Sequence, residues 1–156
     1  MSKPVYIHYG SKKFDPKIGF PVKCNYYHNR IKPVGGLWAS RVDDPDGWKD
    51  WCIRNEFREC SEKNSFKFTL SDKAKIKYIK WDGDLDEEAW FSRYTIDILN
   101  SIDYDMVLEE GYDGIEVTNI EAVYFTLYGW DCNSIVVLNP NVIEPLKRIK
   151  LKNGEN

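Results

Sequence analysis

The alternation of apolar and polar side chains in "SFKFTLSDKAKIKYIK" (residues 65–80) constrains the fold of this chain more than any other feature. Phe66 and Phe68 share one parity of the first half. In the second half an apolar set alternates with a lysine set, Ala74, Ile76 and Tyr78 against Lys73, Lys75 and Lys77. A period of two is typical of half-buried β-strands, so we expect two strands joined at "SDK". The lysines suit the solvent face of an edge strand, and a path for nucleic acid is the alternative.

Further strands are expected wherever a short apolar run is bounded by glycine, proline or polar residues. These runs span residues 4–9, 35–41, 114–117, 122–129 and 133–140. A turn is expected at Gly111. Residues 11–33 are rich in lysine, proline, asparagine and glycine and show little periodicity, so we expect mostly loop there.

Two segments carry the signals of helices. In the first, Asp44 can cap the N-terminus and Pro45 suits the first helical position. The apolar residues that follow form one face, Trp48, Trp51, Cys52 and Phe57. The second segment, residues 82–102, opens with acidic residues and then places apolar side chains three or four apart. Strands therefore dominate, with two helices between early and late strands, which predicts a single α+β domain over residues 1–150 and a frayed tail over 151–156.

Composition and charge bound the classes of function. The chain has 156 residues and a net charge of −3, from 22 Lys and Arg against 25 Asp and Glu, which does not suggest a generic nucleic-acid binder. The four cysteines form no C-x-x-C pair and have no histidine at a zinc-ligand spacing, so we expect no metal site. There is no apolar leader and no run of membrane-span length. We therefore expect a cytoplasmic protein with free thiols and no contact with a membrane.

Three short motifs carry the candidate chemistry. The first, "YIHYGS", places His8 where a strand stops at Gly10. The second, "GGLWAS", is a strand entered through two glycines, and the third, "GWDCN", places Asp131 in a turn before a late apolar strand. Taken singly, each has an ordinary structural interpretation: a hydrogen-bonding histidine, a glycine-led strand and a turn acid. Taken in their order along the chain, the three form a series.

This series resembles the ADP-ribosyltransferase superfamily, whose fold is shared by diphtheria-type toxins and poly-ADP-ribose polymerases. The resemblance extends over residues 5–143 as scattered short motifs, and "YDGIEV" (residues 112–117) is similar to the family's strand just upstream of the third motif. It implies an ADP-ribosyltransferase-like split β-sheet core with flanking helices, and it implies NAD as a substrate.

The resemblance also implies which residues form the site. The catalytic residues would be His8, Asp131 and Asn133. The residues that contact NAD would be His8, Tyr9, Gly10, Ser11, Gly36, Trp38, Ala39 and Ser40. A ring such as Trp38 or Tyr9 could stack on nicotinamide, and the two glycines of "GGLWAS" would let backbone approach the ligand. Arg30 and Lys32 lie where a pyrophosphate could approach.

The chain departs from the family pattern at two of these positions. Trp38 stands where the family usually has tyrosine, and Asn133 falls where its glutamate is expected. An amide cannot carry the negative charge that favours an oxocarbenium-like sugar. Either Asp131 is the catalytic acid, which we prefer, or Asn133 marks an inactive or disabled protein.

The function that the resemblance implies is transfer of ADP-ribose from NAD to a macromolecule. The acceptor would be RNA, DNA or protein, and the lysines at 73–80 and the basic tail at 147–152 keep nucleic acid open. The protein would be a toxin of a toxin–antitoxin or phage-defence system, with an antitoxin or inhibitor protein as a further partner. The alternatives are a non-catalytic binding protein on the same scaffold and an NAD glycohydrolase that uses water as the acceptor.

Overall fold

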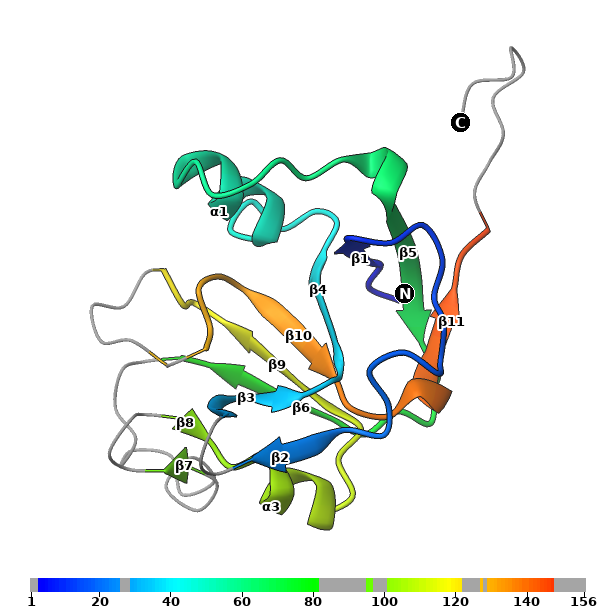
Figure 1. Ribbon diagram of the computed structural model, residues 1–156, viewed down its shortest axis with the longest axis vertical. Coiled ribbons are helices and arrows are strands. Elements are labelled where there is room, and N and C mark those ends of the chain that lie inside the picture. Colours follow the sequence, from blue (N-terminus) through cyan, green and yellow to red (C-terminus); the bar gives the residue numbers. More distant parts are fainter. Residues whose placement is uncertain are drawn as a thin grey trace.

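A computed structural model describes residues 3–25, 29–81, 95–96, 101–121, 127 and 129–147 (Figure 1). The side chains of residues 23–34, 95–96 and 101 are not described, so only the backbone of these strands is considered.

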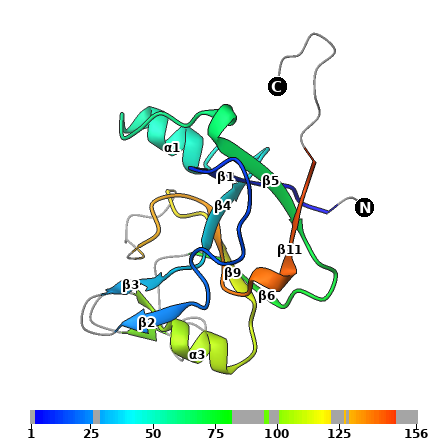
Figure 2. The ribbon, with the colours of Figure 1, turned by 45° about the vertical axis from the view of Figure 1, so that its right-hand side comes forward.

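The main element is a mixed sheet of seven strands that curls into a half-barrel (Figures 1 and 2). In spatial order the strands are β11 (Ile143–Pro145), β5 (Ser65–Leu70), β1 (Tyr6–Tyr9), β4 (Leu37–Arg41), β10 (Ser134–Val137), β9 (Gly114–Thr118) and β6 (Ile76–Lys80). Every neighbouring pair is antiparallel except β6 and β9, which run parallel.

Smaller elements flank this sheet. Two further two-stranded sheets pair β2 (Lys23–Asn25) with β3 (Asn29–Val34) and β7 (Thr95–Ile96) with β8 (Ser101–Ile102). The helices of the described residues are α1 (Trp48–Arg54) and α3 (Tyr104–Glu109), with single 3-10 turns at Glu62–Asn64 and Pro140–Val142. The predicted α+β class is confirmed at this level. In the part of the chain that the structure describes, no helix has the length and apolar character needed to cross a membrane.

Two apolar cores form on opposite faces of the central strands, because successive side chains of a strand point to opposite sides. The tryptophan core contains Ile79, Trp81, Ile102, Tyr104, Val107, Ile115, Val117, Ile120, Leu127, Trp130, Val136 and Leu138. The phenylalanine core contains Tyr6, Leu37, Ala39, Phe66, Phe68, Leu70, Ile135, Val137, Val142 and Ile143, and Phe14 and Phe20 of the loop after β1 pack against it. Because β10 contributes to both cores, its sequence "SIVV" is apolar without alternation.

The predicted pair of strands within residues 65–80 is confirmed as β5 and β6, and β6 is the edge strand of the seven-stranded sheet. The lysine set has local partners. Lys75 Nζ donates 2.9 Å to the carbonyl of Glu110 and lies 4.3 Å from the centre of the Tyr112 ring. The predicted division of faces is not confirmed within β6, because Tyr78 of the apolar set is 57 % exposed and Lys77 is half-buried on the same face as the buried Ile79.

Two predictions of secondary structure are wrong in part. Residues 11–22 form no helix or strand, as expected for a loop, but residues 23–33 contain β2 and most of β3, whose pairing is irregular between Lys23 and Asn25. The predicted helix over 82–102 fails at its end, where the β-branched pair Thr95 and Ile96 lies in β7 and pairs with β8. Residues 82–94 and 97–100 lie outside the described residues, as do 122–126 and 128 of a predicted strand and the tail from 148 onward.

The first helix begins later than predicted. It starts at Trp48 with Gly47 as its N-cap, and not at Pro45. The Asp44 carboxylate accepts instead from the backbone N–H of Asp46 and from the side chain of Asn133. Asp44 therefore stabilises a turn and a contact with a distant loop, and this tertiary contact overrides its capping propensity.

Candidate functional site

The first motif lies where β1 leaves β4. The two strands pair only at Tyr6 with Arg41 and at Ile7 with Ser40. Beyond Ile7, β1 stays paired with β5, while β4 stays paired with β10. The His8 side chain bridges the two strands at this point, because its Nδ1 lies 2.7 Å from the backbone carbonyl oxygen of Trp38. We call this place the β1–β4 junction.

The geometry sets the protonation of His8. A carbonyl oxygen only accepts hydrogen bonds, so the neutral imidazole carries its proton on Nδ1 and donates it to Trp38, leaving a lone pair on Nε2. Burial lowers the pKa of His8, and the bond to the Trp38 carbonyl opposes this shift with a smaller effect. Neutral imidazole is therefore the favoured form, with Nε2 able to accept a hydrogen bond from a hydroxyl group.

The residues after His8 lead the chain out of β1. Gly10 has a φ of +122°, which side chains rarely adopt, and a Cβ there would lie 3.8 Å from His8 Nε2. The Gly10 N–H donates 2.8 Å to the carbonyl of Asn64, which fixes the exit of the strand. Tyr9 is half-buried, and burial, followed by the nearby Glu62, raises its pKa to about 12. The adjacent Ser11 is half-exposed.

The glycines of the second motif serve the packing of the chain. Gly35 has a φ of +96°, and a Cβ there would lie 2.1 Å from the carbonyl oxygen of Gly19. The N–H of Gly36 donates 2.9 Å to that same oxygen. A Cβ at Gly36 would also lie 3.1 Å from Val136 Cγ2. The approach of the loop around Gly19 therefore requires glycine at position 35, and the positive φ of +82° and the contact with Val136 favour glycine at position 36, whether or not a ligand binds.

The Trp38 ring and the His8 ring belong to different cores. Trp38 packs against the tryptophan core, with its ring 4.8 Å from that of Trp130 in an edge-on arrangement. His8 lies 5.3 Å from the ring of Phe66, a member of the phenylalanine core. The structure thus brings the Trp38 carbonyl to His8, but not the Trp38 ring. Ala39 is buried in the phenylalanine core.

Ser40 ties the third motif to the second. Its buried hydroxyl donates 2.8 Å to the carbonyl of Asn133 and accepts from the N–H of Trp48 at 3.0 Å. This one side chain therefore joins β4, the turn before β10 and the first turn of α1.

All the polar groups of Asn133 have partners. Its side-chain Nδ2 donates to Asp44 at 3.1 Å and its Oδ1 accepts from the N–H of Ile120 at 3.2 Å. Its backbone N–H donates to the carbonyl of Asp46 at 3.1 Å. An amide is required here, because a carboxylate could not donate to Asp44 and would lie beside another negative charge. This is a structural role for the residue at which the family pattern expects an acid.

The remaining predicted residues lie apart from these contacts. Asp131 is exposed on the turn before β10 and faces solvent. Arg30 and Lys32 lie on β3, and their side chains are outside the described part of the chain. The structure thus gathers His8, Ser40 and Asn133 around β4 and places Asp131 on an exposed turn. The predicted contacts of Arg30 and Lys32 with a pyrophosphate stay a prediction.

Sequence reasoning missed a buried polar triad at the same junction. Glu116 of β9 is 4 % exposed and accepts from Tyr6 Oη at 2.6 Å. Arg41 reaches across β10 and donates to both oxygens of this carboxylate, Nε to Oε2 at 2.8 Å and Nη2 to Oε1 at 2.9 Å. Burial and Glu116 raise the pKa of Tyr6, and the bonds to Glu116 raise that of Arg41. The one signal in the sequence was a glutamate inside the apolar strand "GIEV".

The triad holds together the strands that carry the motifs. Tyr6 lies two residues before His8 on β1, and therefore on the same face of the sheet, and Arg41 follows Ser40 on β4. The carboxylate of Glu116 is satisfied by three charge-assisted or phenolic hydrogen bonds, so it acts as a brace for the β1–β4 junction.

Metal and thiol chemistry find little support in the described residues. Cys52, Cys60 and Cys132 are free, and burial raises the pKa of Cys132 to about 11, which keeps its thiol protonated at neutral pH. Cys24 has no described side chain. Within the described ranges no group of three His, Cys, Asp or Glu side chains could hold a metal ion.

Comparison of the chain with protein-family models, with curated proteins and with solved structures finds no match.

Proposed function

We propose that the protein binds NAD at the β1–β4 junction and transfers its ADP-ribose to a macromolecule, with nicotinamide as the leaving group. One observation carries the proposal. The motifs "YIHYGS", "GGLWAS" and "GWDCN" are far apart in the sequence, yet they lie on or next to β1, β4 and β10, three consecutive strands of the sheet. The half-barrel would then be an ADP-ribosyltransferase-like sheet whose split is the short pairing of β1 with β4.

The chemistry needs groups that hold the ribose and stabilise positive charge. Breaking the bond between nicotinamide and ribose builds charge on the sugar, as in glycoside hydrolysis. His8 Nε2 has the lone pair to accept a hydrogen bond from a ribose hydroxyl and so to orient the sugar. Asp131 is our candidate for the acid that faces the sugar, since the Asn133 amide is held by Asp44 and Ile120.

A second candidate function is non-catalytic binding on the same scaffold. The full set of structural hydrogen bonds made by Asn133 favours it, because the position that would bear the family's acid is occupied by an amide with a role in folding. Hydrolysis of NAD with water as acceptor would use the same site and differs only in the product.

Incubation with NAD labelled in its adenylate half separates these functions. RNA, DNA and protein acceptors are tested in parallel. Label on a macromolecule supports transfer, free ADP-ribose supports hydrolysis, and unchanged NAD supports binding alone. The matched variants are His8→Ala at the junction and Ile18→Ser, which changes a side chain that is 73 % exposed elsewhere.

We expect His8→Ala to weaken NAD binding and turnover by about 10-fold or more, the typical effect of one well-placed polar contact. Ile18→Ser should leave both unchanged. Equal effects of the two substitutions would contradict the binding of NAD at the β1–β4 junction. Unchanged turnover of NAD in the Asp131→Asn variant would show that Asp131 is not the catalytic acid.

A further inference from the structure

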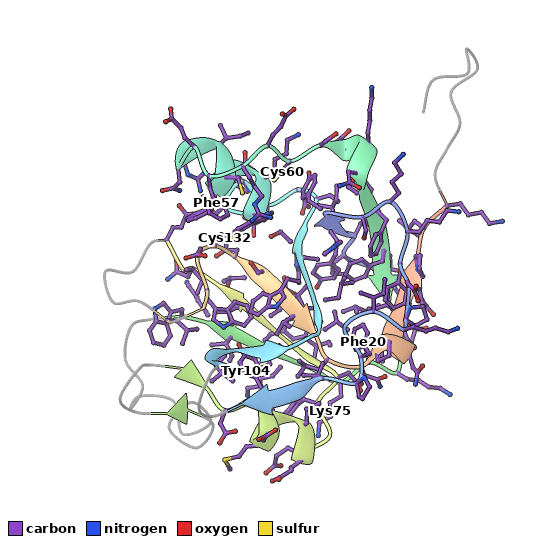
Figure 3. All side chains as sticks on the ribbon, in the orientation of Figure 1. Phe20, Phe57, Cys60, Lys75, Tyr104 and Cys132 are labelled. Atoms are coloured by element: carbon purple, nitrogen blue, oxygen red, sulfur yellow. The ribbon has the colours of Figure 1, made fainter. Side chains whose placement is uncertain are left out.

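A group of three aromatic rings lies around α1, of which Trp48 and Trp51 are half-buried and Phe57 is exposed. The rings of Trp48 and Trp51 stack 5.2 Å apart at an interplanar angle of 12°, and Phe57 meets both edge-on at 5.8 and 5.5 Å. Phe57 is 53 % exposed and Ile53, in the last turn of the helix, is 64 % exposed. Figure 3 shows Phe57 and Cys60 beside α1. Large apolar side chains gathered on one exposed helix end indicate an interaction surface.

The rings of this group already bind one cation. The guanidinium carbon of Arg58 lies 4.8 Å from the centre of the Phe57 ring and 6.0 Å from that of Trp48. Both distances are within the range of cation–π attraction, in which the negative face of a ring attracts a positive group. Arg58 itself is exposed, so this cation lies at the surface of the molecule.

The surroundings of the rings are acidic. Residues 43–62 hold seven acidic and three basic side chains, a net charge of −4 in a chain whose total is −3. One of the three bases, Arg54, forms an ion pair with Glu121. The exposed Asp131 lies close by, because the turn that holds it is fastened to this segment by the bond from the Asn133 N–H to the Asp46 carbonyl. We call residues 43–62 the α1 surface.

We infer that the α1 surface binds a basic, arginine-bearing segment of a partner protein. Acidic side chains around exposed rings complement arginine, which combines a positive charge with a flat group that stacks on aromatic faces. The same charge repels the phosphates of nucleic acid. The negative field would also speed the encounter with a basic partner.

The α1 surface adjoins the β1–β4 junction. The Gly10 N–H donates 2.8 Å to the carbonyl of Asn64, two residues past the end of this surface, and after burial the nearby Glu62 is the next cause that raises the pKa of Tyr9. A segment bound at α1 would therefore lie next to the first motif. That this partner is the acceptor of ADP-ribose rests on the proposed function; its binding does not.

Binding of a fluorescent peptide in the absence of NAD tests the inference. The probe is a 12-residue peptide in which arginine and leucine alternate. One control is the same peptide with every arginine replaced by glutamine. The other control is an oligo-uridylate RNA of similar length. We expect the arginine peptide to bind, with an affinity that falls as salt rises. Phe57→Ala should weaken it by roughly threefold to tenfold, the effect of losing one exposed cation–π face with its apolar contact.

Two variants serve as controls for this test. Ile18→Ser changes another exposed apolar side chain, in the loop after β1, and should leave binding unchanged. The double substitution Glu56→Gln and Glu59→Gln keeps the rings and removes two exposed charges, so it should flatten the salt dependence even if Phe57→Ala were to unfold.

Several results would overturn the inference: stronger binding of the RNA, equal binding of the glutamine peptide, or equal effects of the changes at Phe57 and Ile18. Sedimentation that showed a dimer disrupted by Phe57→Ala would assign the surface to a second copy of the chain instead. The proposed function is scored separately by NAD turnover. Peptide binding without any turnover of NAD would support this inference and contradict the proposed transferase. Turnover of NAD without peptide binding would support the transferase and contradict this inference.

Discussion

Tyr6 Oη donates a 2.6 Å hydrogen bond to Glu116 Oε1 across 110 positions of the chain, and both side chains are buried. Arg41 of β4 balances the charge of the same carboxylate, with its Nε 2.8 Å from Glu116 Oε2. The bond joins β1 to β9, two strands that are not neighbours in the sheet. One carboxylate therefore binds a residue of β1 and a residue of β4, the two strands that form the β1–β4 junction.

Removing this bond should destabilise the fold. We expect Tyr6→Phe to lower the free energy of unfolding by about 1.5–3 kcal/mol, since the bond is made to a charged group and the carboxylate is left buried with one partner fewer. Urea unfolding followed by fluorescence measures the change. Tyr78→Phe, at a tyrosine that is 57 % exposed, is the matched control and should change stability by less than about 0.5 kcal/mol. Equal losses in the two variants would contradict the brace.

The pKa of His8 predicts a dependence of stability on pH. Because burial lowers this pKa in the folded state, the unfolded chain binds more protons near its ordinary value of 6.5. The stability contributed by the neutral ring is therefore present above pH 6.5 and is lost as the pH falls through 6.5, until the folded-state pKa is reached. In His8→Asn, whose amide can still donate to the Trp38 carbonyl, this loss should be absent. Unfolding free energies of the two proteins from about pH 8 to about pH 5 give the comparison; parallel curves would argue against a lowered pKa.

The hydrogen bond between Asn133 and Asp44 predicts a rescue. Asn133→Asp places two carboxylates at a 3.1 Å contact and should cost about 1–3 kcal/mol of stability. Adding Asp44→Asn reverses donor and acceptor and should restore most of it. Thermal unfolding of the single and double variants checks this. NAD turnover measured on the double variant then tests whether an acid at position 133 increases activity in a folded protein. A double variant no more stable than the single one would contradict the pairing.

The structural role of Gly35 in the second motif can be measured without a ligand. Gly35→Ala should destabilise by more than about 2 kcal/mol, because its Cβ would fall 2.1 Å from the Gly19 oxygen in addition to the cost of a positive φ. Gly111→Ala has a similar φ of +82° but nothing within 4 Å of the added Cβ, so about 1 kcal/mol is expected. The difference in melting temperature between the variants measures the close approach alone; no difference would mean that the loop at Gly19 moves away freely.

The strands were predictable where their pattern is local. The alternation in residues 65–80 predicted two strands and the apolar run before Asn139 predicted one, and all three strands are present. The start of α1 was not predictable, because one oxygen of the Asp44 carboxylate bonds to Asn133, which is 89 positions away. The predicted helix that ends at Ile102 failed for a related reason: β7 finds a pairing partner in β8, and pairing of this kind overrides a helical spacing.

The candidate site was predictable only as a set of motifs. The sequence singled out His8, "GGLWAS" and Asn133, and the structure arranges them around β4. Nothing local indicated that the Trp38 ring would turn to the opposite core, or that Gly35 serves the contact with Gly19.

The sequence by itself determined the strand-rich α+β class, the edge strand and the order of the three motifs, because side-chain periodicity and turn chemistry act over a few residues. Only the tertiary structure decided which strands are neighbours, that Asn133 is a structural clamp, and that Glu116 is shared by Tyr6 and Arg41. Those outcomes depend on hydrogen bonds between segments tens of residues apart, and such bonds are selected by the packing of the whole sheet.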